Sequence, residues 1–365
     1  MTAAPVTTGL APLYQVLGAR YVRELAGQGV DAMMVVHKWE GADLLAPHSD
    51  LDLRIVVDRQ PGSWWEWNER LAAAHRAAVV ADPLNRRLLE HPPGFAFVDG
   101  EVGGGHVAAA ELATWSLLHG QAATLQRWKS QAQAVPWSSI DERFYRGILK
   151  ARLGGAYRLE ADSTDNVSAD LPGYLQHCVA WHYLAPCWFA AASLVTRTRF
   201  PGKAAALTQW RPQAVARIMQ PFLESSELAE PPRVLLRLAD EALHAVDTAI
   251  PPAPTSPFMT GASRAVNWTT TTGMLRVRVA RWMYYLDPPP GAQTGYLISR
   301  EAKELRTARR TLLALAESAS SNGERRLATR MAALLPYGPV SARVLRAALA
   351  AWQQRERLVE EFLST

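Results

Sequence analysis

The residues of this chain that are best suited to chemistry lie in the run Ser49-Asp50-Leu51-Asp52-Leu53-Arg54-Ile55-Val56-Val57. The apolar, β-branched second half of the run is typical of a buried strand. Side chains two residues apart in a strand point to the same face, so we expect Asp50 and Asp52 to stand side by side where the strand begins. Carboxylates held that close repel each other unless a cation lies between them. The spacing therefore predicts a divalent-metal site, and Mg²⁺ bound by one or two carboxylates usually acts on phosphates.

A small α/β unit is predicted around this acidic pair. Ser63 follows Pro61-Gly62 and is expected to cap the helix that comes next. Asp99-Gly100 is a common turn dipeptide and predicts a hairpin. The expected elements are a helix over 10–25, a buried strand over 32–36, a loop over 40–49, a strand over 51–57, a helix over 64–80 and a hairpin over 95–102.

The rest of the chain is predicted to be helical, which gives the α+β fold class: a small mixed-sheet domain over 1–107, then a larger all-helical domain over 108–365. Four prolines within 251–257 mark a loop or a boundary inside the second domain, and 287–291 is a helix stop. The helices are expected over 108–130, 140–153, 174–196, 213–226, 233–247, 300–318, 323–335 and 341–362.

Composition favours a soluble cytoplasmic protein with a large core. Of its 365 residues, 48% are hydrophobic and 20% are charged, and the net charge is +5. A nucleotide ligand is compatible with that charge, whereas no concentrated basic stripe indicates nucleic-acid binding. The two cysteines, Cys178 and Cys187, fit a reducing compartment. The most apolar run, 179–195, contains His182 and Pro186, so no membrane span is predicted.

The stretch Val35–Val57 resembles the nucleotidyltransferase superfamily, which has the DNA polymerase β-like fold. The family signature is a strand, a Gly-Ser pair, a short loop and Ser-Asp-x-Asp opening the next strand. Here Gly41-Ala42 stands at the Gly-Ser position and Ser49-Asp50-Leu51-Asp52 follows. The resemblance implies that Mg²⁺ held by Asp50 and Asp52 aligns a nucleoside triphosphate for transfer of its monophosphate, usually adenylate, to an acceptor hydroxyl. Gly41 and Ser49 would shape the phosphate loop.

The third acid of the family site has less clear candidates. Relatives usually carry a further carboxylate, a metal ligand or general base, on the next strand or hairpin. Asp99 and Glu101 are the best positional matches, although Asp99 also suits a plain turn. His106, after three glycines, is another possible base or an exposed loop residue. Because Ala42 replaces the family serine as well, a non-catalytic binding protein on the same fold stays open as an alternative.

The layout is closest to aminoglycoside-type nucleotidyltransferases, which follow such a unit with a helical domain. The segment Tyr183–Trp210 resembles their helix, basic turn and Trp-ending helix. The resemblance implies that Lys203 contacts a nucleotide phosphate, and the alternative is a solvated lysine. A small polar acceptor is expected, in an antibiotic-modifying or biosynthetic reaction. A toxin-type enzyme acting on tRNA or protein is the further option, and no oligomeric state is predicted.

Histidine, cysteine and tryptophan clusters offer further hypotheses. His177, Cys178, His182 and Cys187 do not have the spacing of a zinc site, so a packed core helix is predicted there. The tryptophans at 64, 65 and 67 would either stack on a base or pack against another element.

A basic group in the C-terminal half has two interpretations. Arg276, Arg278 and Arg281 lie near Trp268 and Trp282. They would form either a phosphate- or RNA-binding patch or a helix face that is solvated or salt-bridged.

Overall fold

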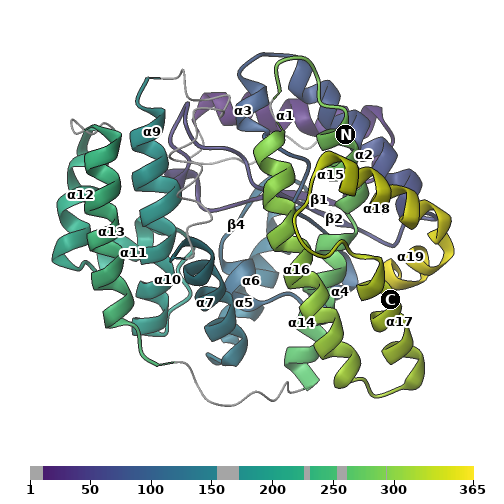
Figure 1. The fold of residues 1–365 in the computed structure, drawn as a ribbon. Helices are drawn as coiled ribbons and strands as arrows, with labels where there is room; N and C mark the ends of the chain where they lie inside the picture. Colours follow the sequence, from purple (N-terminus) through teal and green to yellow (C-terminus); the bar gives the residue numbers. More distant parts are fainter. Residues whose placement is uncertain (1–10, 154–171, 226–230, 253–260, 293) are drawn as a thin grey trace.

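The protein is a mixed α+β structure with a small central sheet surrounded by helices, seen here in a computed structural model (Figure 1). It describes the chain except for residues 1–10, 154–171, 226–230, 253–260 and 293. The strands are β1 (Met34–Lys38), β2 (Leu53–Val57), β3 (Phe95–Val98) and β4 (Trp115–His119). Their order is β3-β2-β1-β4, with β1 antiparallel to β2 and β4, and β2 parallel to β3.

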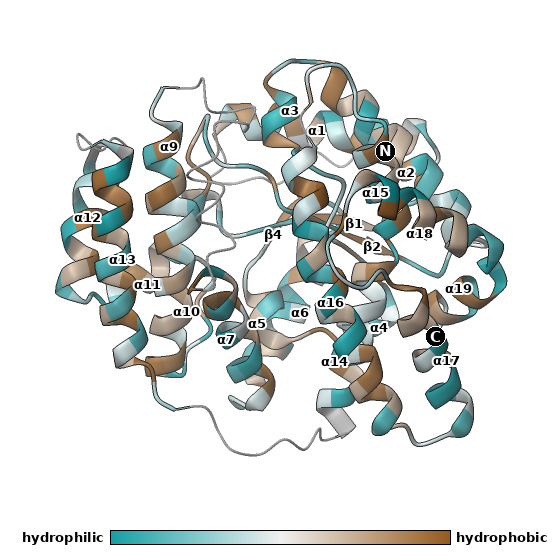
Figure 2. Cartoon of the chain, viewed as in Figure 1, coloured by the Kyte–Doolittle hydropathy of each residue, from teal (hydrophilic) through white to brown (hydrophobic). Residues whose placement is uncertain are grey.

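Alternating side chains bury both faces of the sheet. Val35 and Ile55 join a core with helices α1 (Pro12–Gly27) and α2 (Trp64–Val80). Val36 and Val56 point the other way, toward α4 (Asp99–Gly103), α5 (Ala109–Ala113) and α6 (Ala122–Ala134). Figure 2 shows the apolar residues of β1 and β2 in brown at the centre of the molecule. A sheet covered on both faces explains why its strands are almost continuously apolar.

The remaining helices form two groups on either side of the sheet (Figure 1). The first group shares a separate core, and the second packs onto the core of α1 and α2. The first comprises α7 (Ser139–Leu153), α9 (Tyr174–His177), a π-helical turn η2 (Cys178–Leu184), α10 (Ala185–Thr196), α11 (Lys203–Gln209), α12 (Gln213–Ser225) and α13 (Pro232–Ala249). The second comprises α14 (Gly261–Leu275), α15 (Arg278–Leu286), α16 (Gly295–Glu317), α17 (Asn322–Leu334), α18 (Ala342–Gln354) and α19 (Glu356–Leu363). Two short elements, η1 (Gly41–Asp43) and α3 (Asn85–Leu88), lie between the strands.

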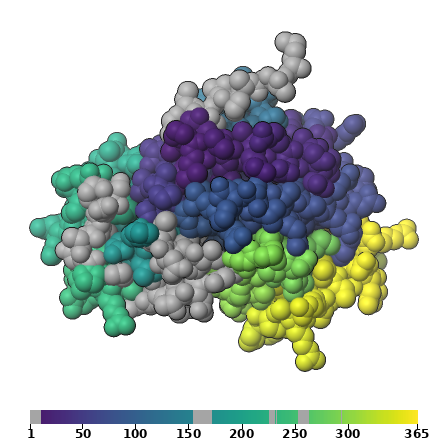
Figure 3. Space-filling model, turned by 90° about the horizontal axis from the view of Figure 1, so that it is seen from above, coloured from purple at the N-terminus to yellow at the C-terminus, as the bar shows by residue number. Residues whose placement is uncertain are grey.

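The N-terminal segment lies between these two helical groups when the molecule is viewed from above (Figure 3). Its purple and blue atoms form a band that borders the teal helices at the left and the green and yellow helices at the lower right. The sheet can therefore contribute residues to a site that both helical groups also line.

Two predictions for the segment after β3 are wrong. The hairpin over 95–102 is a strand followed by helix α4, because the carboxylate of Glu101 turns back and accepts a hydrogen bond from the backbone N–H of Val98 at 2.9 Å. The helix over 108–130 is interrupted by β4, since the buried Trp115 and the residues after it pair with β1. Tertiary pairing overrides the helix propensity of this segment. The sheet thus extends beyond residue 107, where the sequence placed the end of the α/β domain.

Several element predictions are confirmed, and others need adjustment. Helix α2 has the bounds expected from the sequence, and Ser63 Oγ accepts from the N–H of Glu66 at its start. The helix expected over 341–362 is two helices, separated at Arg355. Helices α14 and α15 were not predicted, because a threonine run inside α14 has weak helix propensity. Of the proline-rich 251–257 segment, residues 253–257 lie outside the described residues.

One continuous helical segment of the described chain, Tyr174–Thr196, is long and apolar enough to span a bilayer. It covers the 179–195 run singled out in the sequence, and 89% of its most apolar window is buried inside the protein. Its tryptophans, Trp181 and Trp188, are fully buried, which confirms the predicted packed helix. The segment is thus built like a core helix of a soluble protein.

Candidate functional site

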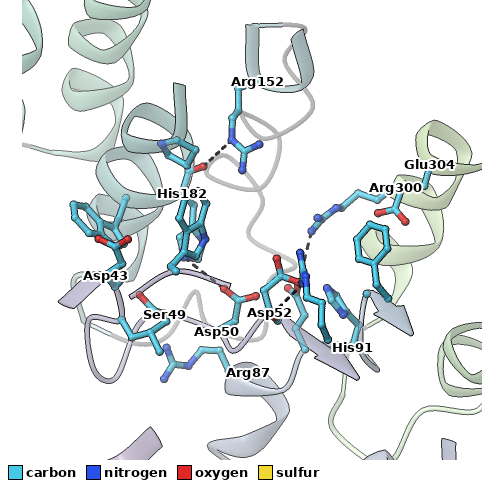
Figure 4. A pocket seen from close by; sticks show the side chains of 18 of the residues that line it. Asp43, Ser49, Asp50, Asp52, Arg87, His91, Arg152, His182, Arg300 and Glu304 are labelled. Carbon is cyan, nitrogen blue, oxygen red and sulfur yellow. Dashed lines mark hydrogen bonds and ion pairs between the residues drawn. The ribbon is translucent and has the colours of Figure 1, made fainter. Parts of the chain in front are cut away.

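A cavity of about 340 Å³ lies where the sheet meets the two helical groups (Figure 4). One wall is the chain leading into β2, together with the start of β3. The second wall comes from η2 and the start of α10 and α11. The third is one face of α16, which contributes residues at helical spacing: Arg300, Lys303, Glu304 and Thr307. Segments that are distant in sequence therefore build one concave site.

Asp50 and Asp52 both line this cavity, on the same wall. They lie just before β2 rather than within it, since the strand begins at Leu53. Backbone hydrogen bonds fix them there: the N–H of Lys38 donates to the carbonyl of Asp52, and the N–H of Leu51 donates to that of Leu88. The pair expected from the i, i+2 spacing thus shares one cavity without being part of the regular strand.

The two carboxylates have different surroundings. Asp52 Oδ1 accepts a 2.6 Å hydrogen bond from Arg54 Nη1, and Arg54 Nε donates to Glu111 Oε1 at 2.8 Å. Burial raises the pKa of Asp52, but the nearby positive charges of Arg54 and Lys38 outweigh it and leave that pKa well below its ordinary value. Asp52 is therefore ionised at neutral pH and already has a cationic partner.

Asp50 instead faces the helical wall. The imidazole Nε2 of His182 lies 3.8 Å from Asp50 Oδ1. Burial, followed by the positive charges of Lys203 and Arg152, lowers the pKa of His182 to about 3, so its ring is neutral at neutral pH. A neutral imidazole adds no positive charge beside the Asp50 carboxylate.

Lys203 lies in the cavity wall and is only 4% exposed, which contradicts the alternative of a solvated lysine. Its Nζ lies 4.5 Å from the ring centroid of Trp181 and 5.1 Å from that of Trp39. Burial lowers the pKa of Lys203 to about 8, although Asp43 and Asp50 counteract the effect. Asp43 also fixes the backbone here, because its carboxylate accepts hydrogen bonds from the N–H groups of Lys203 and Ala204 at the start of α11.

The charge of the cavity lining is positive on balance. Among the described residues, seven Lys and Arg side chains line it together with five Asp and Glu side chains: Arg54, Arg87, Arg152, Lys203, Arg281, Arg300 and Lys303, and Asp43, Asp50, Asp52, Glu90 and Glu304. Within the described residues, Nη1 and Nη2 of the buried Arg87 have no hydrogen-bond partner. A lining of this kind favours an anionic ligand.

Of the other predicted site residues, some line the cavity and others lie outside it. Ser49 lines the cavity, and its Oγ accepts from the N–H of Leu45 at 3.0 Å, which closes the loop before Asp50. Gly41 begins η1 and is not part of the lining, whereas Asp43 in the same turn is. Asp99 and Glu101 are also outside the lining.

Glu101 forms an ion pair with an arginine and does not line the cavity. Both of its oxygens accept from the fully buried Arg276, at 2.6 and 2.8 Å. Arg278 and Arg281 are likewise buried and paired with carboxylates on α16. The basic group at 276–281 is therefore an internal ion-pair network, which confirms the salt-bridged option and not the exposed nucleic-acid patch or the solvated face. The tryptophans at 64 and 67 are also buried in the core and do not line the cavity.

The sequence did not identify several residues of the cavity. Arg54 lies two residues after Asp52, so the strand periodicity that paired the two acids could have included it. His182 was noticed only as a zinc candidate. The α16 residues carry no local signal, because their only link to the acids is tertiary.

This set of side chains supplies only part of the ligands that a metal ion needs. Among the described residues, no group of three or more His, Cys, Asp and Glu side chains could hold a metal ion by itself. Mg²⁺, however, is commonly held by one or two carboxylates together with substrate phosphates. Asp50, whose carboxylate faces the cavity, meets that requirement when a phosphorylated ligand supplies the remaining oxygens.

Comparisons with known proteins do not assign the chain to a family or a fold. No protein-family model, curated protein or solved structure matches this chain.

Proposed function

We propose that this protein transfers a nucleotidyl group, usually adenylyl in the family it resembles, from a nucleoside triphosphate to a small polar acceptor in a Mg²⁺-dependent reaction. One observation carries the proposal: in the described part of the chain, Asp50 and Asp52 share a cavity with seven Lys and Arg side chains. Acids placed to hold a divalent cation, opposite many basic groups, are the arrangement that phosphoryl-transfer chemistry requires.

Each wall of the cavity has a part in binding the triphosphate. Lys203 and the α16 residues Arg300 and Lys303 would bind phosphate oxygens, because their positive charges line the same cavity as the acid pair. Asp50 would hold the Mg²⁺, which when bound neutralises phosphate charge and orients the α-phosphate for attack. The ring of Trp39, beside Lys203, offers an aromatic surface for the base or the acceptor.

Cavity size favours a small acceptor. The volume of about 340 Å³ is at the lower end of the range for small-molecule sites, about 300–1,000 Å³. A nucleotide and a small polar molecule would fill such a space, whereas a tRNA or a protein could insert only one terminal group. We therefore prefer an antibiotic-modifying or biosynthetic reaction to a toxin-type one.

Nucleotide binding without catalysis is the second candidate function, and one contact favours it. Asp52 is engaged by Arg54 at 2.6 Å, and neither Asp99 nor Glu101 lies in the lining to complete an acidic triad. The two functions share a ligand but differ in turnover.

The first test of the proposal is thermal stabilisation by ATP, GTP, CTP and UTP, each with and without Mg²⁺. At least one nucleotide is expected to raise the melting temperature in a Mg²⁺-dependent way, because a ligand that binds only the folded state stabilises it. Asp50→Asn should abolish the Mg²⁺-dependent part. Asp99→Asn is the matched control, since it removes the same charge outside the cavity and should keep the shift.

Pyrophosphate release then separates catalysis from binding. A panel of small polar acceptors should give acceptor-dependent pyrophosphate from the stabilising nucleotide. If a nucleotide binds but no acceptor yields pyrophosphate, the non-catalytic function replaces the enzyme. If none of the four nucleotides shifts the melting temperature, both functions are wrong.

A further inference from the structure

Trp39 follows β1 directly, in a backbone conformation that bulky residues seldom adopt. Its φ is 80°, in the left-handed region. A side chain of this size costs free energy there, so the surrounding contacts must hold it in place. Two hydrogen bonds fix the chain at this point: the N–H of Lys38 donates to the carbonyl of Asp52 at 2.9 Å, and the N–H of Trp39 donates to that of Thr114 at 2.7 Å. The chain thus leaves the sheet in a strained turn, and the residue in that turn lines the cavity.

The indole of Trp39 lies beside two lysines that differ in their partners. Lys38 Nζ is 4.8 Å from its ring centroid and pairs with Glu111 at 3.9 Å. Lys203 Nζ is 5.1 Å from the same centroid and 4.5 Å from that of Trp181, and no ion pair in the described part of the chain includes it. Aromatic rings attract an ammonium through their quadrupole and leave its charge in place. Lys203 is therefore held by rings while its positive charge remains for a ligand.

The same loop also fixes the backbone around this lysine. Asp43 Oδ2 accepts from the N–H of Lys203 at 2.7 Å, and the carbonyl of Asp43 accepts from Trp181 Nε1 at 2.6 Å. Trp181 and Lys203 are thus both bound to the loop that Trp39 begins. A group that is already ordered in its binding position loses less conformational entropy when the ligand arrives.

We propose that Trp39 and Trp181 clamp the ammonium of Lys203 in the cavity as a preformed charge for a nucleotide phosphate, and that the left-handed backbone of Trp39 places its indole in this clamp. The inference rests on the nucleotide binding proposed above. Trp39 is a positioning residue, because it acts on the ligand through Lys203. Direct stacking of its ring on the base or the acceptor is the competing role, and the two roles differ when Lys203 is removed.

A double-mutant cycle on nucleotide affinity separates these roles. Isothermal titration calorimetry at pH 7 uses Mg²⁺ and the nucleotide that gives the largest thermal shift. Trp39→Leu should weaken binding about fivefold, and Trp39→Phe, which keeps an aromatic face, should stay within about twofold of the wild type. In the Lys203→Gln background, Trp39→Leu should change the dissociation constant by less than about twofold, because no ammonium is left to hold.

Trp65→Leu is the matched control, since Trp65 is a half-buried tryptophan outside the cavity lining and its variant should bind as the wild type does. Wild-type affinity in Trp39→Leu would overturn the clamp. A fivefold loss that persists without Lys203 would also overturn it, in favour of direct stacking. If the wild-type chain binds none of the four nucleotides, the proposed function falls and this inference falls with it.

A second measurement does not depend on the folding of Trp39→Leu. Tryptophan analogues with one, two or three ring fluorines, placed at position 39, weaken the ring quadrupole and nearly preserve its shape. Nucleotide affinity should fall stepwise with the number of fluorines in the wild-type background and stay constant in Lys203→Gln. A constant affinity in both backgrounds would contradict the clamp.

The role of the backbone has its own test. Trp39→Gly should melt at a higher temperature than Trp39→Ala, because glycine adopts a φ of 80° without the penalty that a Cβ carries. The reverse order, or equal melting temperatures, would overturn the part of the inference that concerns the left-handed backbone.

Discussion

At the scale of single residues, chemically identical side chains acquire different properties from their neighbours. Asp50 and Asp52 are equivalent in the sequence motif, yet Arg54 binds Asp52 whereas the ring of His182 lies beside Asp50. Lys203 would be an ordinary surface lysine by composition, yet it lies buried between two indole rings. Local environment therefore decides which of these groups is available to a ligand.

Lys203 should make nucleotide affinity depend on pH. Burial lowers its pKa to about 8, so its ammonium is charged below that pH and loses its charge as the pH rises through it. Because a phosphate favours the charged form, the dissociation constant is expected to increase between about pH 7 and pH 9. Lys203→Gln should weaken binding about tenfold at pH 7 and remove the Lys203 contribution to this trend. Isothermal titration calorimetry measures both effects.

The control for this prediction is Lys150→Gln. Lys150 is exposed near the end of α7 and does not line the cavity, so its variant should bind as the wild type does at every pH. An unchanged dissociation constant at pH 7 in Lys203→Gln would show that Lys203 does not contact the phosphates.

At the scale of elements, carboxylates from distant parts of the chain complete the starts of helices. Asp43 of η1 accepts from the first N–H groups of α11, which ties the loop after β1 to the helical wall of the cavity. Glu360 of α19 does the same for α2: it accepts from the N–H groups of Trp64 and Trp65 and from Ser63 Oγ. The free N–H groups of a helix start need such acceptors.

Removing the Glu360 carboxylate should therefore destabilise the protein. Glu360→Ala is expected to lower the free energy of unfolding by about 1.5 kcal/mol, because it leaves two N–H groups at the start of α2 without their acceptor. Urea denaturation followed by circular dichroism gives the value. Glu361→Ala, an exposed neighbour, should change it by less than about 0.5 kcal/mol. Equal effects of the two substitutions would show that the cap does not contribute.

At the scale of the whole molecule, the N-terminal sheet and the C-terminal helices share one core. Helix α14 crosses β3 at Gly273, where an added Cβ would lie 2.8 Å from Phe97 Cε1 and 3.1 Å from the carbonyl oxygen of Ala96. Contacts this close leave no space for a methyl group. The third wall of the cavity, α16, packs against α14 in turn, so this crossing helps to hold α16 in place.

Gly273→Ala should consequently destabilise the protein by about 2 kcal/mol, as overpacking of a tight contact does. Gly147→Ala is the matched control: Gly147 is an exposed helical glycine on α7 with nothing within 4 Å of an added Cβ. That substitution should stabilise the protein by about 0.5–1 kcal/mol, since alanine favours a helix. Urea denaturation of both variants measures the difference, and a neutral Gly273→Ala would contradict the close crossing.

Local patterns in the sequence were sufficient for part of this architecture. The strands predicted over 32–36 and 51–57 overlap β1 and β2, helix α2 has its predicted bounds, and the short spacing of Asp50 and Asp52 placed them in one cavity. These are short-range properties, because each depends on residues within a few positions of one another. The magnesium and nucleotide roles inferred from the motif remain predictions.

Tertiary structure alone decided the rest. It placed Glu101 on Arg276, 175 residues away, rather than in the site, and it made a strand of 115–119 by pairing it with β1. It also brought Lys203, His182 and the basic face of α16 to the acid pair. The composition and spacing of a segment carry no record of a partner that lies far along the chain, so those contacts become visible only when packing brings the segments together.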